Sequence, residues 1–135
     1  MIKIEHIGIA VKSVAGSVSL FETLLDSRCY KTETVETEQV KTAFFKVGET
    51  KIELLEGIQK DGIIAKFIEK KGEGIHHIAL DVDNIQKEME RLTNEGFKIL
   101  NEKPAKGADN KLVCFLHPKT TNGILIELCQ EIGGS

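Results

Sequence analysis

Several features that mark whole classes of proteins are missing from this sequence. Cysteine occurs only three times, at Cys29, Cys114 and Cys129, without C-x-x-C spacing, so neither a disulfide framework nor a thiolate zinc site is indicated. No stretch approaches the roughly 18 consecutive apolar residues of a membrane helix, and the first residues do not resemble a secretory signal. The formal net charge of −3 provides no positive footprint for nucleic acid. We therefore expect a soluble cytoplasmic protein that binds neither membranes nor nucleic acid.

One short pattern is present twice in the sequence. The segment EHIGIAV returns as HHIALDV, and KIELLE returns as LIELCQ, so each copy opens on a histidine and closes on a glutamate. With 135 residues and 41% hydrophobic content, the chain is long and apolar enough for one domain with a sizeable core. We expect a single domain over residues 1–135, made of module 1 at about 1–60, a linking helix at about 61–72 and module 2 at about 73–132.

Alternating apolar residues predict the first strand of each module. Residues 2–11 have the period of two that a strand requires, so His6 lies on the opposite face from Ile7 and Ile9. The second copy has the same alternation around His77. One face of each strand is thus apolar enough to pack against a helix, whereas the other carries a histidine followed by small residues.

A helix and further strands follow each of these first strands. Apolar residues recur at helical spacing after Ser13 and after Asp83, and we expect these two residues to cap the helices, Asp83 together with Gln86 in a capping box. Strand-like runs come next, with additional strands expected near 28–35 and 97–102. The order is β-α-β-β-β in each half, which predicts an α+β fold.

The repeated histidines and glutamates form a candidate metal site. Strand alternation places Glu53 and Glu127 on the faces that also carry His6 and His77, respectively. Two imidazoles and two carboxylates suit one divalent ion of Mn, Fe, Co, Ni or Zn. A buried carboxylate without a partner is costly, and a cation removes that cost. The duplication therefore predicts His6, Glu53, His77 and Glu127 as the ligands of a single ion.

Other polar residues have simpler interpretations. His76 adjoins His77 but lies on the opposite strand face, so it is not expected to be a ligand. Four lysines in the second half are typical of a solvated surface, with a phosphate-binding patch as the alternative; they are Lys103, Lys106, Lys111 and Lys119. The segment KGADNK between them can form a tight loop whose amides face an anion.

The duplicated pattern resembles the vicinal oxygen chelate superfamily over essentially the whole chain. Within it, the segments AKFIEKKGEGIHHIA and HPK...NG.LIEL are similar to those of methylmalonyl-CoA epimerases. The resemblance implies paired β-α-β-β-β modules that form a curved mixed sheet around a metal ion, with cobalt favoured. It also implies an acyl-CoA substrate, a homodimer, and a 1,1-proton transfer that interconverts the R and S epimers through a metal-stabilised enolate.

The resemblance further assigns roles to individual residues. It gives the metal ligands as His6, Glu53, His77 and Glu127. Glu127 is the best candidate for the base that removes the α-proton, because a glutamate beside the chelated substrate can reach the α-carbon. Inversion also needs a proton donor on the opposite face of the substrate, for which Glu53 or a positioned water is the candidate.

Three residues outside the ligand set also receive roles from the resemblance. Gly107 and Ala108 correspond to the loop that holds the substrate carboxylate through backbone amides. Thr42, a candidate substrate contact, stands where several of these epimerases carry a second catalytic glutamate.

Two other functions are consistent with parts of the pattern. The histidine and glutamate skeleton is also that of glyoxalase I (lactoylglutathione lyase), whose members usually close on a DPDG-type turn where this chain has HPKTTNG. A metal-free ligand-sequestering protein of the bleomycin-resistance type is the third candidate, although such binders need not keep all four metal ligands.

Overall fold

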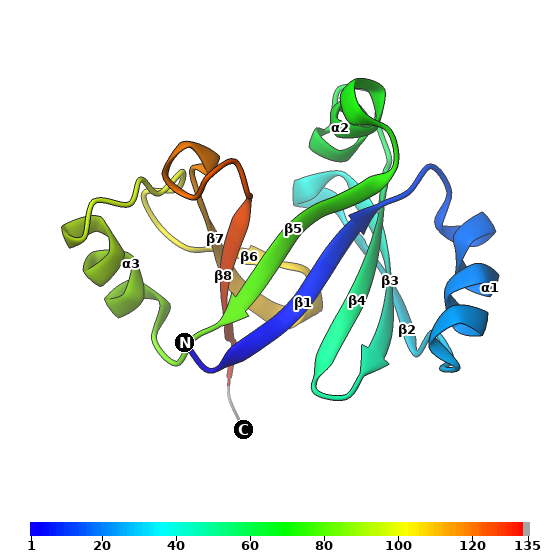
Figure 1. Cartoon of the computed structure of the whole chain (residues 1–135), viewed down its shortest axis with the longest axis horizontal. Coiled ribbons are helices and arrows are strands. Elements are labelled where there is room, and N and C mark those ends of the chain that lie inside the picture. Colours follow the sequence, from blue (N-terminus) through cyan, green and yellow to red (C-terminus); the bar gives the residue numbers. More distant parts are fainter. Residues whose placement is uncertain (134–135) are drawn as a thin grey trace. The chain divides into compact units, whose positions relative to one another are not determined.

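The computed structural model describes residues 1–133, which fall into two compact units. The N-terminal unit comprises His6–His76, and the C-terminal unit combines Met1–Glu5 with the chain from His77 onward. The chain passes from one unit to the other inside two strands, β1 (Lys3–Ala10) and β5 (Gly74–Asp81), which are labelled in Figure 1. Each crossing point therefore lies directly before a histidine of the repeated pattern.

The N-terminal unit contains a mixed sheet with strand order β2-β3-β4-β1. Strand β1 runs parallel to β4, whereas β3 pairs with both β2 and β4 in antiparallel fashion. The other elements of this unit are α1 (Val14–Leu25), β2 (Lys31–Val35), a 3-10 turn (Glu36–Glu38), β3 (Val40–Val47), β4 (Thr50–Gly57) and α2 (Ile63–Lys71).

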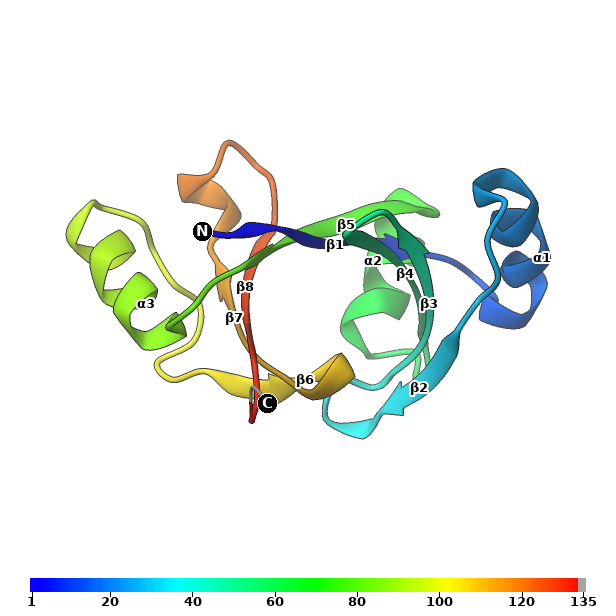
Figure 2. The same ribbon diagram turned by 90° about the horizontal axis from the view of Figure 1, so that it is seen from below.

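Helix α1 covers one face of this sheet by packing on β3 and β4 (Figure 2). The helix begins after Ser13, whose side chain accepts a hydrogen bond from the Gly16 N–H, as the sequence predicts. Its predicted apolar stripe packs in a cluster of buried residues from β3, β4, the segment after β1 and the start of the helix itself. The cluster consists of Val11, Val14, Ala43, Phe45 and Leu54. Helix α2 packs on β4, where Gly57 is required because a Cβ atom there would lie 2.8 Å from the Ala65 nitrogen.

The C-terminal unit contains the strands β1-β5-β8-β7-β6, in this order, of the same eight-stranded sheet, and Met1–Glu5 supplies its β1 residues. The Ile2 N–H donates to the Asp81 carbonyl at 2.8 Å, β5 runs parallel to β8, and β7 is antiparallel to β6 and β8. The other elements are α3 (Ile85–Asn94), β6 (Ala105–Gly107), a 3-10 turn (Ala108–Asn110), β7 (Lys111–Leu116), a 3-10 turn (Pro118–Thr120) and β8 (Ile126–Glu131).

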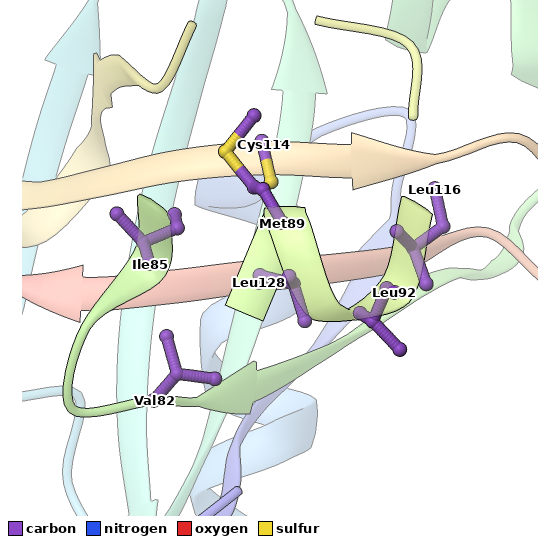
Figure 3. Packing of buried hydrophobic residues seen from close by; sticks show 7 residues of the cluster. All are labelled: Val82, Ile85, Met89, Leu92, Cys114, Leu116 and Leu128. Atoms are coloured by element: carbon purple, nitrogen blue, oxygen red, sulfur yellow. The ribbon is translucent and has the colours of Figure 1, made fainter. Parts of the chain in front are cut away.

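Helix α3 packs against the sheet of the C-terminal unit and forms its main apolar core. Figure 3 shows the side chains of α3 meeting those of β7 and β8. The buried members are Val82, Ile85, Met89, Leu92, Cys114, Leu116 and Leu128. Both halves of the chain thus have the predicted order β-α-β-β-β, and the predicted α+β class is confirmed.

Two local predictions were wrong. The cap of α3 is Asn84 and not Asp83, because the Asn84 side chain accepts the Lys87 N–H at 3.1 Å. The segment 97–102 is not a strand and makes only an isolated bridge between Ile99 and Leu116. The Asn101 side chain accepts the Phe115 N–H at 2.9 Å, which removes this donor from a regular ladder. The additional strand of this half is the three-residue β6 instead.

Within residues 1–133, no helix combines the length and the apolar composition needed to cross a bilayer.

Candidate functional site

In the N-terminal unit, the parallel pairing of β1 and β4 brings His6 next to Glu53. Gly8 is the register partner of Glu53, and His6 lies two residues before Gly8 on the same face of the sheet. The His6 Nε2 atom is 3.4 Å from Glu53 Oε2, and the two residues are only 6% and 4% exposed. The neighbours of Glu53, Ile52 and Leu54, pack on the opposite face under α1.

In the C-terminal unit, the parallel pairing of β5 and β8 repeats this arrangement. Ala79 is the register partner of Glu127, and His77 lies two residues before Ala79. The His77 Nε2 atom is 3.1 Å from Glu127 Oε1, and both residues are buried. The rings of Phe115 and His77 pack edge to face, with their centres 5.9 Å apart. Each unit thus places a small residue opposite its glutamate, which leaves room above the sheet.

The separation within each pair suits two ligands of one cation. Donor atoms at about 2.1 Å from a cation lie about 3.4 Å apart in tetrahedral geometry and about 3.0 Å apart in octahedral geometry. The observed separations of 3.4 Å and 3.1 Å match these values. Each pair is therefore suited in donor type, spacing and burial to a divalent metal ion.

Thr42 lies on the same face of the N-terminal sheet as Glu53. Its register partner in β4 is Leu55, two residues beyond Glu53, and its partner in β2 is Glu33. Thr42 is fully buried, and its hydroxyl donates to the Glu33 carbonyl oxygen at 2.9 Å. The hydroxyl hydrogen is therefore used in a hydrogen bond to the main chain. Thr42 thus contributes to packing but offers no hydrogen-bond donor to a substrate.

Gly107 and Ala108 lie at the end of β6 in the C-terminal unit. Gly107 is buried and pairs with Lys111, whereas Ala108 begins the 3-10 turn. The turn continues through Asp109 and Asn110, which both have positive φ angles, of 57° and 54°. Non-glycine residues seldom adopt this left-handed conformation, so the path of this loop is unusual.

The interpretation of the four lysines as a solvated surface was wrong for one of them. Lys103, Lys106 and Lys119 are exposed, but Lys111 is only 7% exposed. Lys111 lies in β7 on the same face as Val113. Burial raises the pKa of Asp81 above its usual value, and the charge of Lys111 opposes this rise. The available signal was the spacing of Lys111, Val113 and Phe115. They occupy every second position of the strand, so the lysine shares a face with two apolar residues.

The cysteines of the C-terminal unit are buried thiols. Cys129 shares the face of Glu127 and packs against Ala79 and Val113. Burial, aided by the Glu127 charge, raises the pKa of Cys129 far above its usual range and that of Cys114 to about 11. Both remain protonated at neutral pH, so neither is suited to act as a nucleophile.

Comparison with known proteins shows clear relatives. The profile of the Glyoxalase/Bleomycin resistance protein/Dioxygenase superfamily matches residues 5–115. The uncharacterized protein YqjC of Bacillus subtilis is 38% identical, with 98% of this chain and 95% of that protein covered. The ethylmalonyl-CoA/methylmalonyl-CoA epimerase of Cereibacter sphaeroides is 35% identical, with coverages of 95% and 97%. A methylmalonyl-CoA epimerase variant of Streptomyces coelicolor, solved with 2-nitronate-propionyl-CoA, is 29% identical with a TM-score of 0.94, and 98% of this chain and 96% of that chain are covered.

Proposed function

Because the chain belongs to the Glyoxalase/Bleomycin resistance protein/Dioxygenase superfamily, we propose that it is a metal-dependent epimerase that interconverts the R and S epimers of methylmalonyl-CoA. The observation that carries the proposal is the pair of buried histidine–glutamate contacts at equivalent places in both halves. Epimerases among the relatives, which match the chain over nearly its whole length, support the choice of substrate.

We propose that His6, Glu53, His77 and Glu127 together hold one divalent ion. Mn, Fe, Co, Ni and Zn all suit two imidazoles and two carboxylates, and the family resemblance favours Co. When bound, the ion acts as a Lewis acid that stabilises negative charge on the oxygen atoms of the substrate. Nothing in the donor set distinguishes among these metals, because geometry and supply decide which one a site takes up.

The side chains perform the proton transfer. Glu127 removes the α-proton, since its carboxylate lies on an inward face whose apolar neighbours, Val113 and Cys129, exclude water. Gly107 and Ala108 hold the free carboxylate of the substrate by their backbone amides, which keeps the α-carbon in place. Glu53 stays beside His6 as a metal ligand and is one candidate for the second proton transfer. We further propose that the protein is a homodimer, which light scattering would report as twice the mass of one 15.0 kDa chain.

The decisive experiment follows the α-proton of the substrate. Metal-loaded protein is incubated with (S)-methylmalonyl-CoA in deuterated water, and NMR records α-deuterium together with the ratio of the epimers. A hemithioacetal isomerase assay runs beside it, and Glu127→Gln serves as the matched variant with its carboxylate neutralised. We expect deuterium incorporation with epimerisation in the wild type and a loss of roughly 10²- to 10⁴-fold in Glu127→Gln. Hemithioacetal isomerase activity without α-proton exchange would indicate glyoxalase I instead. No activity in either assay, together with failure to bind metal, would indicate a sequestering protein.

A further inference from the structure

Inversion at the α-carbon needs proton-transferring groups on both faces of the substrate, and Thr42 has no carboxylate to offer. We propose that Glu33, on the neighbouring strand β2, is the second acid–base group of this reaction. The inference rests on the proposed epimerase function, and it assigns a role to a residue that the sequence pattern did not single out.

The strand register places Glu33 on the face that carries His6 and Glu53. Glu33 is the direct cross-strand partner of Thr42, and Phe44, two residues after Thr42, is the partner of Glu53. Residues paired across a sheet share a face, so Glu33 and Glu53 project from the same side of the N-terminal sheet. Strand β2 lies two strand spacings from β4, or about 10 Å, and β3 between them contributes Thr42 and Phe44 to the same face.

Side-chain contacts agree with this register. Lys31, two residues before Glu33, has its Nζ atom 5.1 Å from the centre of the Phe44 ring. The same Nζ atom lies 3.5 Å from Glu33 Oε1. Since Phe44 faces the same way as its partner Glu53, the contact of Lys31 with the Phe44 ring fixes the direction of both β2 side chains. Glu33 is thus held toward the face of the metal-binding pair.

The hydroxyl of Thr42 cannot replace Glu33 as the proton donor. It donates to the Glu33 carbonyl oxygen at 2.9 Å and is fully buried. That hydrogen bond instead secures the main chain of Glu33 at this position of β2. The side chain of Glu33 is 32% exposed, against 5% for Glu53, so Glu33 can exchange its proton with solvent between turnovers.

The proposed step conserves protons and electrons. A carboxylate on one face takes the α-proton, and the electron pair of the broken C–H bond becomes part of the enolate. Protonated Glu33 then donates its proton to the α-carbon from the other face, a new C–H bond forms, and Glu33 is left ionised. Exchange with water restores both carboxyl groups, and the reverse reaction uses Glu33 as the base.

The test separates exchange from inversion in Glu33→Gln, a substitution that keeps the size of the side chain and removes its acid–base function. Glu36→Gln is the control, because Glu36 is an exposed glutamate in the following 3-10 turn and loses the same charge. Each metal-loaded enzyme is incubated with (S)-methylmalonyl-CoA in deuterated water. NMR follows the α-deuterium, and a stereospecific coupling enzyme follows the R epimer.

If Glu33 is the second group, its glutamine variant slows inversion by at least about 100-fold, the lower end of general acid–base effects. Exchange of the α-proton with retention of configuration continues in this variant, because the first carboxylate can return the deuteron that it has acquired. The control variant inverts the substrate at the wild-type rate.

Unchanged inversion in Glu33→Gln, or an equal loss of inversion and exchange, would overturn the assignment of Glu33 while leaving the epimerase function intact. Absence of both activities in the wild type would overturn the proposed function, and the assignment with it.

Discussion

The alternation of side chains along β8 makes a sharp prediction about Leu128, the neighbour of Glu127. Leu128 is fully buried in the core beneath α3, on the opposite side of the strand from Glu127. Leu128→Ala removes about three methylene-sized groups, each worth about 0.8 kcal/mol of transfer free energy. The cavity left between α3 and the sheet adds to this cost, and measured Leu→Ala substitutions in cores span about 2.7–5.0 kcal/mol. We expect the free energy of unfolding to fall by about 3–4 kcal/mol.

Urea denaturation followed by far-UV circular dichroism measures this loss, with the slope compared between variant and wild type to verify that the same surface unfolds. Turnover per folded molecule should stay within about two-fold of the wild type, because a deleted side chain on the far face leaves the Glu127 carboxylate in place. Glu127→Gln should behave in the opposite way, with activity lost and little change in folding. A destabilisation below about 1 kcal/mol for Leu128→Ala would refute the assignment of the two faces of β8.

Three further outcomes follow from the structure. Alkylation of the native protein at pH 8 should modify the half-buried Cys29 first, because burial raises the pKa of Cys114 to about 11 and that of Cys129 further; peptide mass spectrometry would contradict this if Cys114 reacted first. Removal of metal by a chelator should lower the melting temperature, since an ion that binds only the folded state at 100 times its Kd adds about 2.7 kcal/mol; identical melting of treated and reloaded protein would exclude tight binding. If residues 1–135 form a single domain, calorimetry should show one cooperative transition, and two separate transitions would contradict it.

Periodicity was a sound guide to the strands that carry the histidines and glutamates. The alternation around His6 and Glu53 decides which side chains pack under α1 and which do not, because a strand has only two faces. The same reasoning applies to Leu128 and Glu127. Local patterns therefore sufficed to place the pairs on inward faces, and the structure brings each histidine to its own glutamate.

The failures came from choices that local patterns do not determine. Asp83 and Asn84 are both good caps, and only the path of the chain after β5 selects the second. The segment after α3 looked like a strand, but the Asn101 side chain takes the N–H that a ladder would need. The position of Glu33 opposite Thr42 could not be predicted, because strand register is a non-local property of the sheet.

The crossing of the chain between the units inside β1 and β5 has a practical consequence. The first five residues complete the sheet of the second half, where the Ile2 N–H donates to the Asp81 carbonyl oxygen. A gene fragment encoding only the second repeat would lack this neighbour and would display β5 as a bare edge, open to pairing with other chains and to aggregation. A fusion in which a flexible linker joins Met1–Glu5 to the N-terminus of a fragment beginning at His77 would protect that edge. The apparent sequence repeats are thus poor places to cut this protein, and its separable pieces are interleaved along the chain.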